Sequence, residues 1–163
     1  IVIHYMADTM DRGNHEYSGK YIVIDPHYYN NHPIERGDVI LVNTDQGTDL
    51  IFRVVGLPGE KLQIIHSQIY INDKKLDTYY GEFHRLGKNI EDLKREYSMS
   101  QDSNISHLIE QTQNYTTNEI HLSNEQYYVI GDDWFRSPNM NPVTKTDIIG
   151  KVLGYSTESM LQN

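Results

Sequence analysis

Two short stretches carry the side chains whose types and positions could support chemistry. The first, YMADTMDRGN, contains the hydroxyl of Thr9 and, beside it, the carboxylate of Asp8. The second, DLIFRVVGLPGE, places the inert side chain of Phe52 directly before Arg53. A hydroxyl becomes a useful nucleophile only when a nearby base takes its proton. The chemistry open to this chain therefore depends on whether any residue supplies that base.

Composition excludes several other kinds of chemistry. The 163 residues include no cysteine, which rules out thiolate catalysis, disulfides and most structural zinc sites. We expect neither a metal nor a cofactor. The net charge is −9, and a field of that sign repels phosphate backbones, so nucleic acid is not an expected partner.

Short β-branched and aromatic runs dominate both ends of the chain and predict β-strands. Turn residues bound them, most clearly at residues 36–38, 57–60 and 72–73. Strands with turns at this spacing favour an antiparallel, barrel-like or sandwich-like domain. The predicted strands are residues 1–6, 20–25, 38–43, 50–56, 61–66, 68–73, 126–132 and 147–155.

Residues 78–124 differ from the rest of the chain because they are polar and carry helical spacing. One helix is predicted after Asn89 as N-cap, and a second after Asp102 or Ser103. The apolar faces of the two helices are predicted to be Ile90, Leu93 and Tyr97, and Ile105, Leu108 and Ile109. We predict a lid or cap inserted into a β core that consists of residues 1–77 and 125–163.

Several pieces, taken in order, resemble the conserved boxes of type I signal peptidases, the membrane-bound Ser/Lys proteases that remove leader peptides outside the membrane. The best of them is RVVGLPGE, which is similar to the family's box around its lysine and arginine. The resemblance covers most of the chain outside residues 78–124 and implies a mainly β fold, an antiparallel core of coiled sheets that forms a partly closed barrel. The similar stretches are ERGDVILV (35–42), FRVVGLPGE (52–60), IYINDKKL (69–76), YYVIGDDWFRS (127–137) and DIIGKVLG (147–154).

The resemblance also assigns the family's catalytic positions. In active members a serine attacks the scissile carbonyl, and a lysine whose pKa is lowered by burial takes the proton. Thr9 stands at the serine position, or Asp8 if the alignment shifts by one residue. Phe52 stands at the lysine position, and its side chain cannot accept a proton. The proline and threonine of the family's S-M-x-P-T motif are replaced by Arg12 and Gly13.

The last box of the family is also altered. Ser137 is kept, but Asn139 and Met140 replace the carboxylate and the hydroxyl that follow it. No other base is placed near Thr9 by the sequence pattern, so we expect no functional catalytic residue. The histidines and lysines that could stand in for the missing base are His4, His15, His27, Lys20, Lys61 and Lys151.

A member of this family without a base resembles the signal-peptidase-like factors encoded beside pilus genes of Gram-positive bacteria, which assist sortase-dependent polymerisation of pilins. The resemblance implies pilin subunits, sortase or both as partners. It also implies an extended peptide that pairs with a strand edge in the groove. The candidate groove residues are Ile1, Ile3, Tyr5, Tyr21 and Val23.

Two further expectations follow from the same resemblance. The alternative function is an active type I signal peptidase with an altered, threonine-based site, which cuts after Ala-x-Ala. The expected location is the extracytoplasmic face of the cell membrane, with an N-terminal anchor ahead of Ile1. No apolar run in these residues approaches the roughly 20 residues that a membrane span needs.

Overall fold

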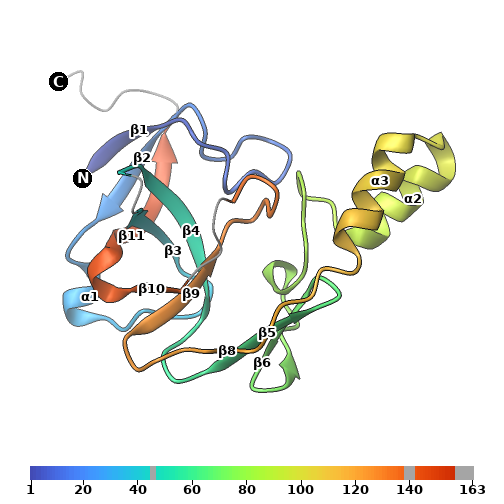
Figure 1. Ribbon diagram of the computed structural model, residues 1–163. Helices are drawn as coiled ribbons and strands as arrows, with labels where there is room; N and C mark the ends of the chain where they lie inside the picture. Colours follow the sequence, from blue (N-terminus) through green and yellow to red (C-terminus); the bar gives the residue numbers. More distant parts are fainter. Residues whose placement is uncertain (45–46, 138–141, 157–163) are drawn as a thin grey trace.

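The computed structural model describes residues 1–44, 47–137 and 142–156. Its strands form two antiparallel sheets, and a pair of helices projects from one side (Figure 1). This arrangement confirms the mainly β, antiparallel fold predicted from the sequence. Among the described residues, no helix is long and apolar enough to cross a membrane.

The larger sheet has seven strands in the order β1-β2-β11-β3-β4-β9-β10. All of its pairings are antiparallel, and β11, the last of the described strands, lies between β2 and β3. A short helix, α1 (Tyr28–Asn31), joins β2 to β3, and a 3-10 turn, η2 (Lys145–Asp147), leads into β11. The strands are β1 (Val2–Tyr5), β2 (Lys20–Asp25), β3 (Val39–Asn43), β4 (Asp49–Gly56), β9 (Gln126–Ile130), β10 (Pro142–Thr144) and β11 (Ile148–Ser156).

Strand β4 is the centre of the structure. It is buried from Leu50 to its end, because most of the strand contacts one hydrophobic cluster and its last part contacts a second. Phe52 and Val54 belong to the cluster inside the larger sheet, and Val55 belongs to the cluster beneath the smaller one. A continuous apolar run is the pattern expected of a strand covered on both faces.

The smaller sheet has four strands in the order β7-β6-β5-β8. Strand β8 pairs with β5 and lies within residues 78–124, so this segment contributes a strand to the sheet as well as the helices. The strands are β5 (Lys61–Ile65), β6 (Gln68–Ile71), β7 (Lys74–Lys75) and β8 (Ile120–His121).

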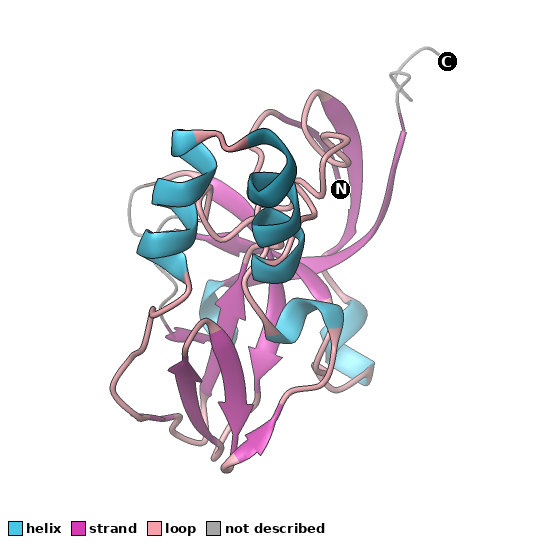
Figure 2. Ribbon diagram, turned by 90° about the vertical axis from the view of Figure 1, so that its right-hand side faces the viewer, coloured by secondary structure: helices cyan, strands magenta, loops and turns pink. Residues whose placement is uncertain are grey.

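The two predicted helices form a hairpin. Helix α2 (Ile90–Ser100) begins after Asn89, whose side chain accepts from the backbone N–H of Asp92 in a capping box. Helix α3 (Ser103–Thr112) begins after Asp102 as N-cap. Both predicted starts are therefore confirmed, and Figure 2 shows the helices side by side.

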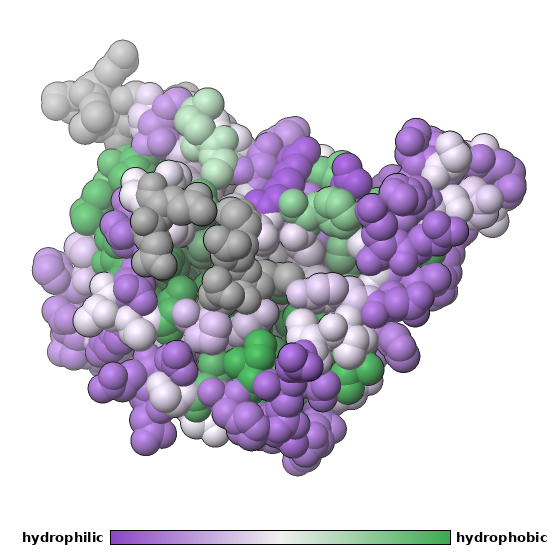
Figure 3. All heavy atoms as spheres, in the orientation of Figure 1, coloured by the Kyte–Doolittle hydropathy of each residue, from purple (hydrophilic) through white to green (hydrophobic). Residues whose placement is uncertain are grey.

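The hairpin buries little of its surface. Leu93 of α2 and Leu108 and Ile109 of α3 join the cluster beneath the smaller sheet. The face visible in Figure 3 is largely hydrophilic over this hairpin. The helices therefore contact the rest of the protein through a narrow apolar stripe.

A buried ion pair connects β4 to the loop that follows β9. Arg53 on β4 donates from Nε and Nη2 to the two carboxylate oxygens of Asp132, at 2.8 and 2.7 Å, just after β9. Its Nη1 donates to the carbonyl of Gly37 at 2.8 Å. Only 10% of the Arg53 side chain and 2% of the Asp132 side chain are exposed. Burial acts to lower the pKa of Arg53, but the hydrogen bonds and charge of Asp132 raise it overall.

We expect the Arg53→Met variant to lose about 3–5 kcal/mol of unfolding free energy, because the substitution leaves the Asp132 carboxylate buried without its partner. The measurement is urea denaturation followed by circular dichroism. The control is the double variant Arg53→Met/Asp132→Leu, which removes both charges and should recover part of the loss. Equal stability of the single variant and the wild type would contradict the assigned role of the pair.

Excision of residues 90–111 and their replacement by a short Gly-Ser linker should leave the two sheets folded. The segments before and after the hairpin are held by the same residue, because the carbonyl of Ser67 accepts the N–H of Phe83 at 2.8 Å and its hydroxyl donates to the carbonyl of Thr112. We expect a lower melting temperature, because Leu93, Leu108 and Ile109 no longer cover their cluster. Circular dichroism should show a cooperative transition with less helical signal, and a non-cooperative melt would contradict this expectation.

Candidate functional site

Thr9 lies in the loop after β1, is 1% exposed, and has both sides of its hydroxyl occupied. Its Oγ1 donates to the carbonyl of Ile51 at 2.6 Å and lies 2.9 Å from the hydroxyl of Tyr5. The Tyr5 hydroxyl accepts the backbone N–H of Ile51 at 3.0 Å. A carbonyl can only accept, so Thr9 gives its proton to Ile51 and Tyr5 gives its own proton to Thr9. The three residues form a closed hydrogen-bonded ring.

This ring closes the open edge of β4. The backbone N–H of Val54 donates to the carbonyl of Asp38, directly before β3, at 2.9 Å. Backbone groups alternate in direction along a strand, so those of Arg53 and Ile51 point away from β3. Arg53 pairs with Ile130, where β9 ends, and leaves Ile51 without a partner strand. The hydroxyls of Tyr5 and Thr9 therefore take the place of the missing strand residue.

Phe52 follows Ile51 and is 3% exposed. It belongs to the same hydrophobic cluster as Tyr5 and Met10, the residue after Thr9. The peptide bond between Ile51 and Phe52 therefore carries the carbonyl that binds the Thr9 hydroxyl. An aromatic hydrocarbon at this position fills space in the core and cannot accept a proton.

No described residue acts as a base toward Thr9. Burial raises the pKa of Tyr5, so its phenol stays protonated and acts as a donor. The other candidate bases have different contacts or are exposed. Among the histidines, His4 stacks on Tyr21, His15 contacts Asp8, and His27 is exposed. Among the lysines, Lys20 donates to the Glu16 carbonyl, Lys61 to Asp73 and Lys151 to Asp38.

The loop after β9 meets the Thr9 loop at Gly131. A Cβ at Gly131 would lie 1.9 Å from Ser137 Oγ and 2.2 Å from the Thr9 carbonyl, so no side chain fits there. The Thr9 carbonyl accepts the N–H of Asp133 at 3.0 Å, and the Ser137 hydroxyl donates to the Asp133 carbonyl at 2.8 Å. Thr9, Ser137 and the strand that carries Phe52 are thus brought together. Asn139 and Met140 lie outside the described residues.

Asp8, the alternative to Thr9, points to a charged cluster on the surface. Its carboxylate lies 2.9 Å from His15 Nδ1 and 3.0 Å from Arg136 Nη1, which is also 2.8 Å from Asp11. The hydrogen bond to Asp8 raises the pKa of His15. Asp8, Asp11 and His15 have the donor atoms of a cation site, but the guanidinium of Arg136 already neutralises their charge.

The candidate groove residues lie on two faces of the sheet. Ile3 pairs with Ile22, which is buried, and Tyr5 points into the core, whereas Tyr21 and Val23 alternate to the opposite face. Ile1, directly before β1, is 60% exposed. We expected Tyr5 in a peptide groove, but its side chain is buried, and its hydroxyl accepts the backbone N–H of Ile51 at the edge of β4.

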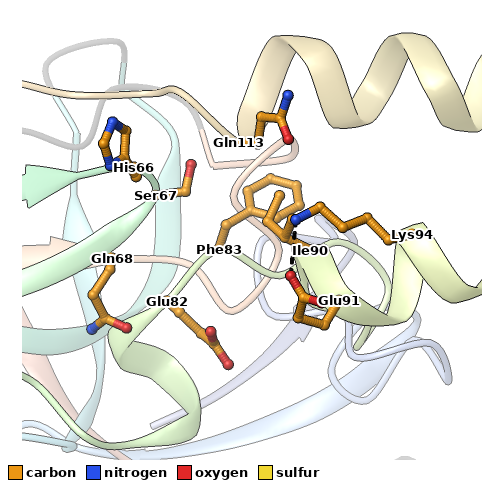
Figure 4. Close-up of a pocket in the computed structure, with 9 residues that line it drawn as sticks. All are labelled: His66, Ser67, Gln68, Glu82, Phe83, Ile90, Glu91, Lys94 and Gln113. Carbon is orange, nitrogen blue, oxygen red and sulfur yellow. Dashed lines mark hydrogen bonds and ion pairs between the residues drawn. The ribbon is translucent and has the colours of Figure 1, made fainter.

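A separate pocket of about 270 Å³ lies between the β5–β6 turn and α2, as Figure 4 shows. Its polar groups are largely paired: Lys94 binds Glu91 at 2.9 Å, and Gln68 donates to three backbone carbonyls. Phe83 and Ile90 supply apolar walls. The pocket contains none of the residues around Thr9, so it is not a candidate active site.

Sequence reasoning missed the role of Tyr5 in hydrogen bonding and the role of Asp133. Tyr5 and Ile51 are 46 positions apart, and no local pattern connects them. Asp133 is fully buried and accepts the N–H groups of Leu86, Phe135 and Arg136. Burial raises the pKa of this carboxyl. The sequence showed that Asp133 belongs to the last family box, but it did not show that the carboxylate of Asp133 binds the N–H of Leu86, within residues 78–124.

Known proteins resemble this chain along most of its length. The family model described as "Signal peptidase, peptidase S26" matches residues 4–155. Signal peptidase I of Rickettsia typhi is 32% identical over 136 residues, which cover 72% of this chain and 50% of that protein. Signal peptidase I of Bacillus caldolyticus is 33% identical over 63 residues, 39% of this chain and 35% of that protein. The chain thus spans about half the length, or less, of these curated relatives.

A solved structure supports the same assignment at the level of the fold. The crystal structure of a signal peptidase I from Enterococcus faecalis V583 aligns with a TM-score of 0.50 at 23% identity, covering 74% of this chain and 97% of that chain. Together with the ordered boxes and the meeting of Thr9, Gly131 and Ser137, the family match leads to one conclusion: this chain belongs to the signal peptidase family, peptidase S26.

Proposed function

We propose that this chain is a non-catalytic member of its family that binds an extended peptide without cutting it. The observation that carries the proposal is the hydroxyl of Thr9, whose proton is donated to the carbonyl of Ile51 at 2.6 Å. Phe52 adds to it by leaving the expected base position without a proton acceptor. Loss of a nucleophile–base unit typically lowers the rate by several orders of magnitude.

The alternative is an active signal peptidase with a threonine nucleophile. Family membership and the meeting of Thr9 with Gly131 and Ser137 favour it. This function would require the Thr9 hydroxyl to leave Ile51 and to find a base that reaches Oγ1. Oγ1 has only Tyr5 and Ile51 as partners among the described residues, so the alternative needs a rearrangement that the non-catalytic function does not.

The outer edge of β1 is the proposed peptide-binding edge. The backbone N–H and carbonyl groups of Ile1 and Ile24 form two hydrogen bonds of 2.7 and 2.8 Å, so the backbone of Ile1 faces β2. Because backbone groups alternate in direction along a strand, those of Val2 and His4 point away from β2. Because β1 is the end strand of its sheet, these groups can pair with an extended peptide. The β4 edge is less suited, because Tyr5 and Thr9 occupy it at Ile51.

The proposed setting is the extracytoplasmic face of the cell membrane, reached through an N-terminal anchor, where the clients are pilin subunits, sortase or both. The resemblance to signal-peptidase-like pilus assembly factors supports this, as do the substitutions at Thr9 and Phe52. Exposed apolar side chains on β1, just before and after it, and on β11 are suited to a membrane-proximal or apolar contact. They are Ile1, Val2, Met6, Leu153 and Tyr155.

The decisive test of catalysis is incubation of the purified protein with a labelled leader peptide that contains Ala-x-Ala, beside an active signal peptidase I. We expect no cleavage by the wild type above the level of the Thr9→Ala variant, because no base activates the hydroxyl. The measurement is product formation by gel or mass spectrometry. Cleavage by the wild type that Thr9→Ala abolishes would establish the alternative function.

Binding of the same peptide should depend on the outward N–H groups of β1. We expect His4→Pro to weaken binding by about tenfold while β1 stays paired, because that N–H faces away from β2 and an edge strand tolerates proline there. The matched variant is Ile3→Pro, which removes an N–H directed at β2 and should lower the melting temperature. Fluorescence anisotropy measures the binding, and unchanged affinity of His4→Pro would overturn the choice of this edge.

A further inference from the structure

A hollow of about 400 Å³ is lined by Asp132, the partner of Arg53, and by two neighbouring loops. The loop after β1 forms one wall, with Arg12 and Glu16, and η1 (Tyr79–Gly81) forms another, with Tyr79 and Tyr80. Asp132 is the buried floor. The hollow shares none of its lining residues with the Thr9–Tyr5–Ile51 ring.

Arg12 brings unused hydrogen-bond donors to this hollow. Its closest approaches to carboxylates are made by Nε, at 3.7 Å from Asp132 and 3.8 Å from Glu16, both too long for hydrogen bonds. Among the described residues its guanidinium donates no hydrogen bond, and 44% of its side chain is exposed. The two Nη groups are therefore available to a ligand.

The Arg12 guanidinium is nevertheless held in place. It lies over the ring of Tyr79, 5.4 Å from the centroid. Its backbone N–H donates to Glu16 Oε2 at 2.7 Å. Its carbonyl would lie 2.3 Å from a Cβ on Gly87, so the neighbouring loop packs directly against it. A positioned planar fork of donors binds a planar anion with little ordering cost.

The buried charge at the floor forms no hydrogen bond with this fork, although Asp132 Oδ2 lies within ion-pair distance of Arg12 Nε. Both oxygens of Asp132 accept from Arg53, and the third Arg53 contact is the Gly37 carbonyl. The pair is therefore satisfied without Arg12. Glu16 remains as the one acidic side chain close to Arg12 on the wall, and its charge favours a singly charged ligand over a doubly charged phosphate.

We propose that this hollow binds a carboxylate of a peptide through Arg12, with Tyr79 and Tyr80 as aromatic walls. The carboxylate can come from a peptide C-terminus or from an Asp or Glu side chain, and the chemistry of recognition is the same. Arg12 stands where signal peptidases carry the proline of S-M-x-P-T, so the family pattern assigns it no role. The site does not depend on whether Thr9 is catalytic.

Three dipeptides test the proposal by NMR titration of the ¹⁵N-labelled protein: Ac-Ala-Tyr with a free C-terminus, Ac-Ala-Tyr-NH2, and Ac-Ala-Asp-NH2. We expect at least one carboxylate peptide to bind about tenfold more tightly than the neutral amide, with shifts at residues 12–16 and 79–80. Binding by the first peptide alone identifies a C-terminus as the ligand, and binding by the third alone identifies a side chain.

The variants separate Arg12 from general charge effects. We expect Arg12→Gln to weaken carboxylate binding by about tenfold, Arg12→Lys to weaken it less, and Glu16→Gln to tighten it. The matched control is Arg95→Gln, an exposed arginine on α2 that contacts Asp92 at 3.4 Å, which should leave binding unchanged. If the Arg12→Gln variant fails to fold, the expected tighter carboxylate binding by Glu16→Gln still tests the proposal.

Three outcomes would overturn the proposal: equal binding of the neutral amide, unchanged affinity of a folded Arg12→Gln variant, or equal losses in Arg12→Gln and Arg95→Gln. Tighter binding by Glu16→Gln without shifts at residues 79–80 would also overturn it, because the ligand would then lie outside the hollow.

Discussion

The buried pair of Arg53 and Asp132 is the interaction on which the arrangement of the site depends. Removing two charges from water is costly, and this cost is met only because each donor and acceptor has a partner. Arg53 binds both oxygens of Asp132 and the carbonyl of Gly37, and its guanidinium also lies over Tyr79, 5.1 Å from the ring centroid. It thereby fixes β4, the turn before β3, the loop after β9 and the segment after β7 relative to one another.

The sequence allowed the fold to be predicted well because its signals are local. Turn residues, strand periodicity and the helix starts at Asn89 and Asp102 were readable directly, and the family boxes supplied the order of the strands. The boxes also contact one another: Arg36 binds Glu60 at 2.6 Å, and Lys151 binds Asp38 at 2.7 Å. The pairing of β8 with β5 was missed, because a two-residue strand carries almost no pattern.

The site was only partly predictable. The absence of a base at Phe52 follows from residue type alone. The places of Thr9 and Ser137 in the family boxes were readable, but the contact of their loops at Gly131 was not. The ring through Tyr5 and Ile51 could not be foreseen, because it forms between segments more than forty positions apart and depends on where β9 ends. The charge of Arg12 was visible in the sequence. That its guanidinium donates no hydrogen bond within the described part of the chain could be seen only in the structure, because Asp132 and Glu16 lie just beyond hydrogen-bond distance.

The closed edge of β4 has a consequence for the stability of the core. A buried backbone N–H or carbonyl without a partner costs roughly 1–3 kcal/mol. The hydroxyls of Tyr5 and Thr9 satisfy both backbone groups of Ile51, which is fully buried. The hydroxyl of residue 9 therefore has a structural role that does not depend on catalysis. Its presence in the sequence does not by itself indicate a nucleophile.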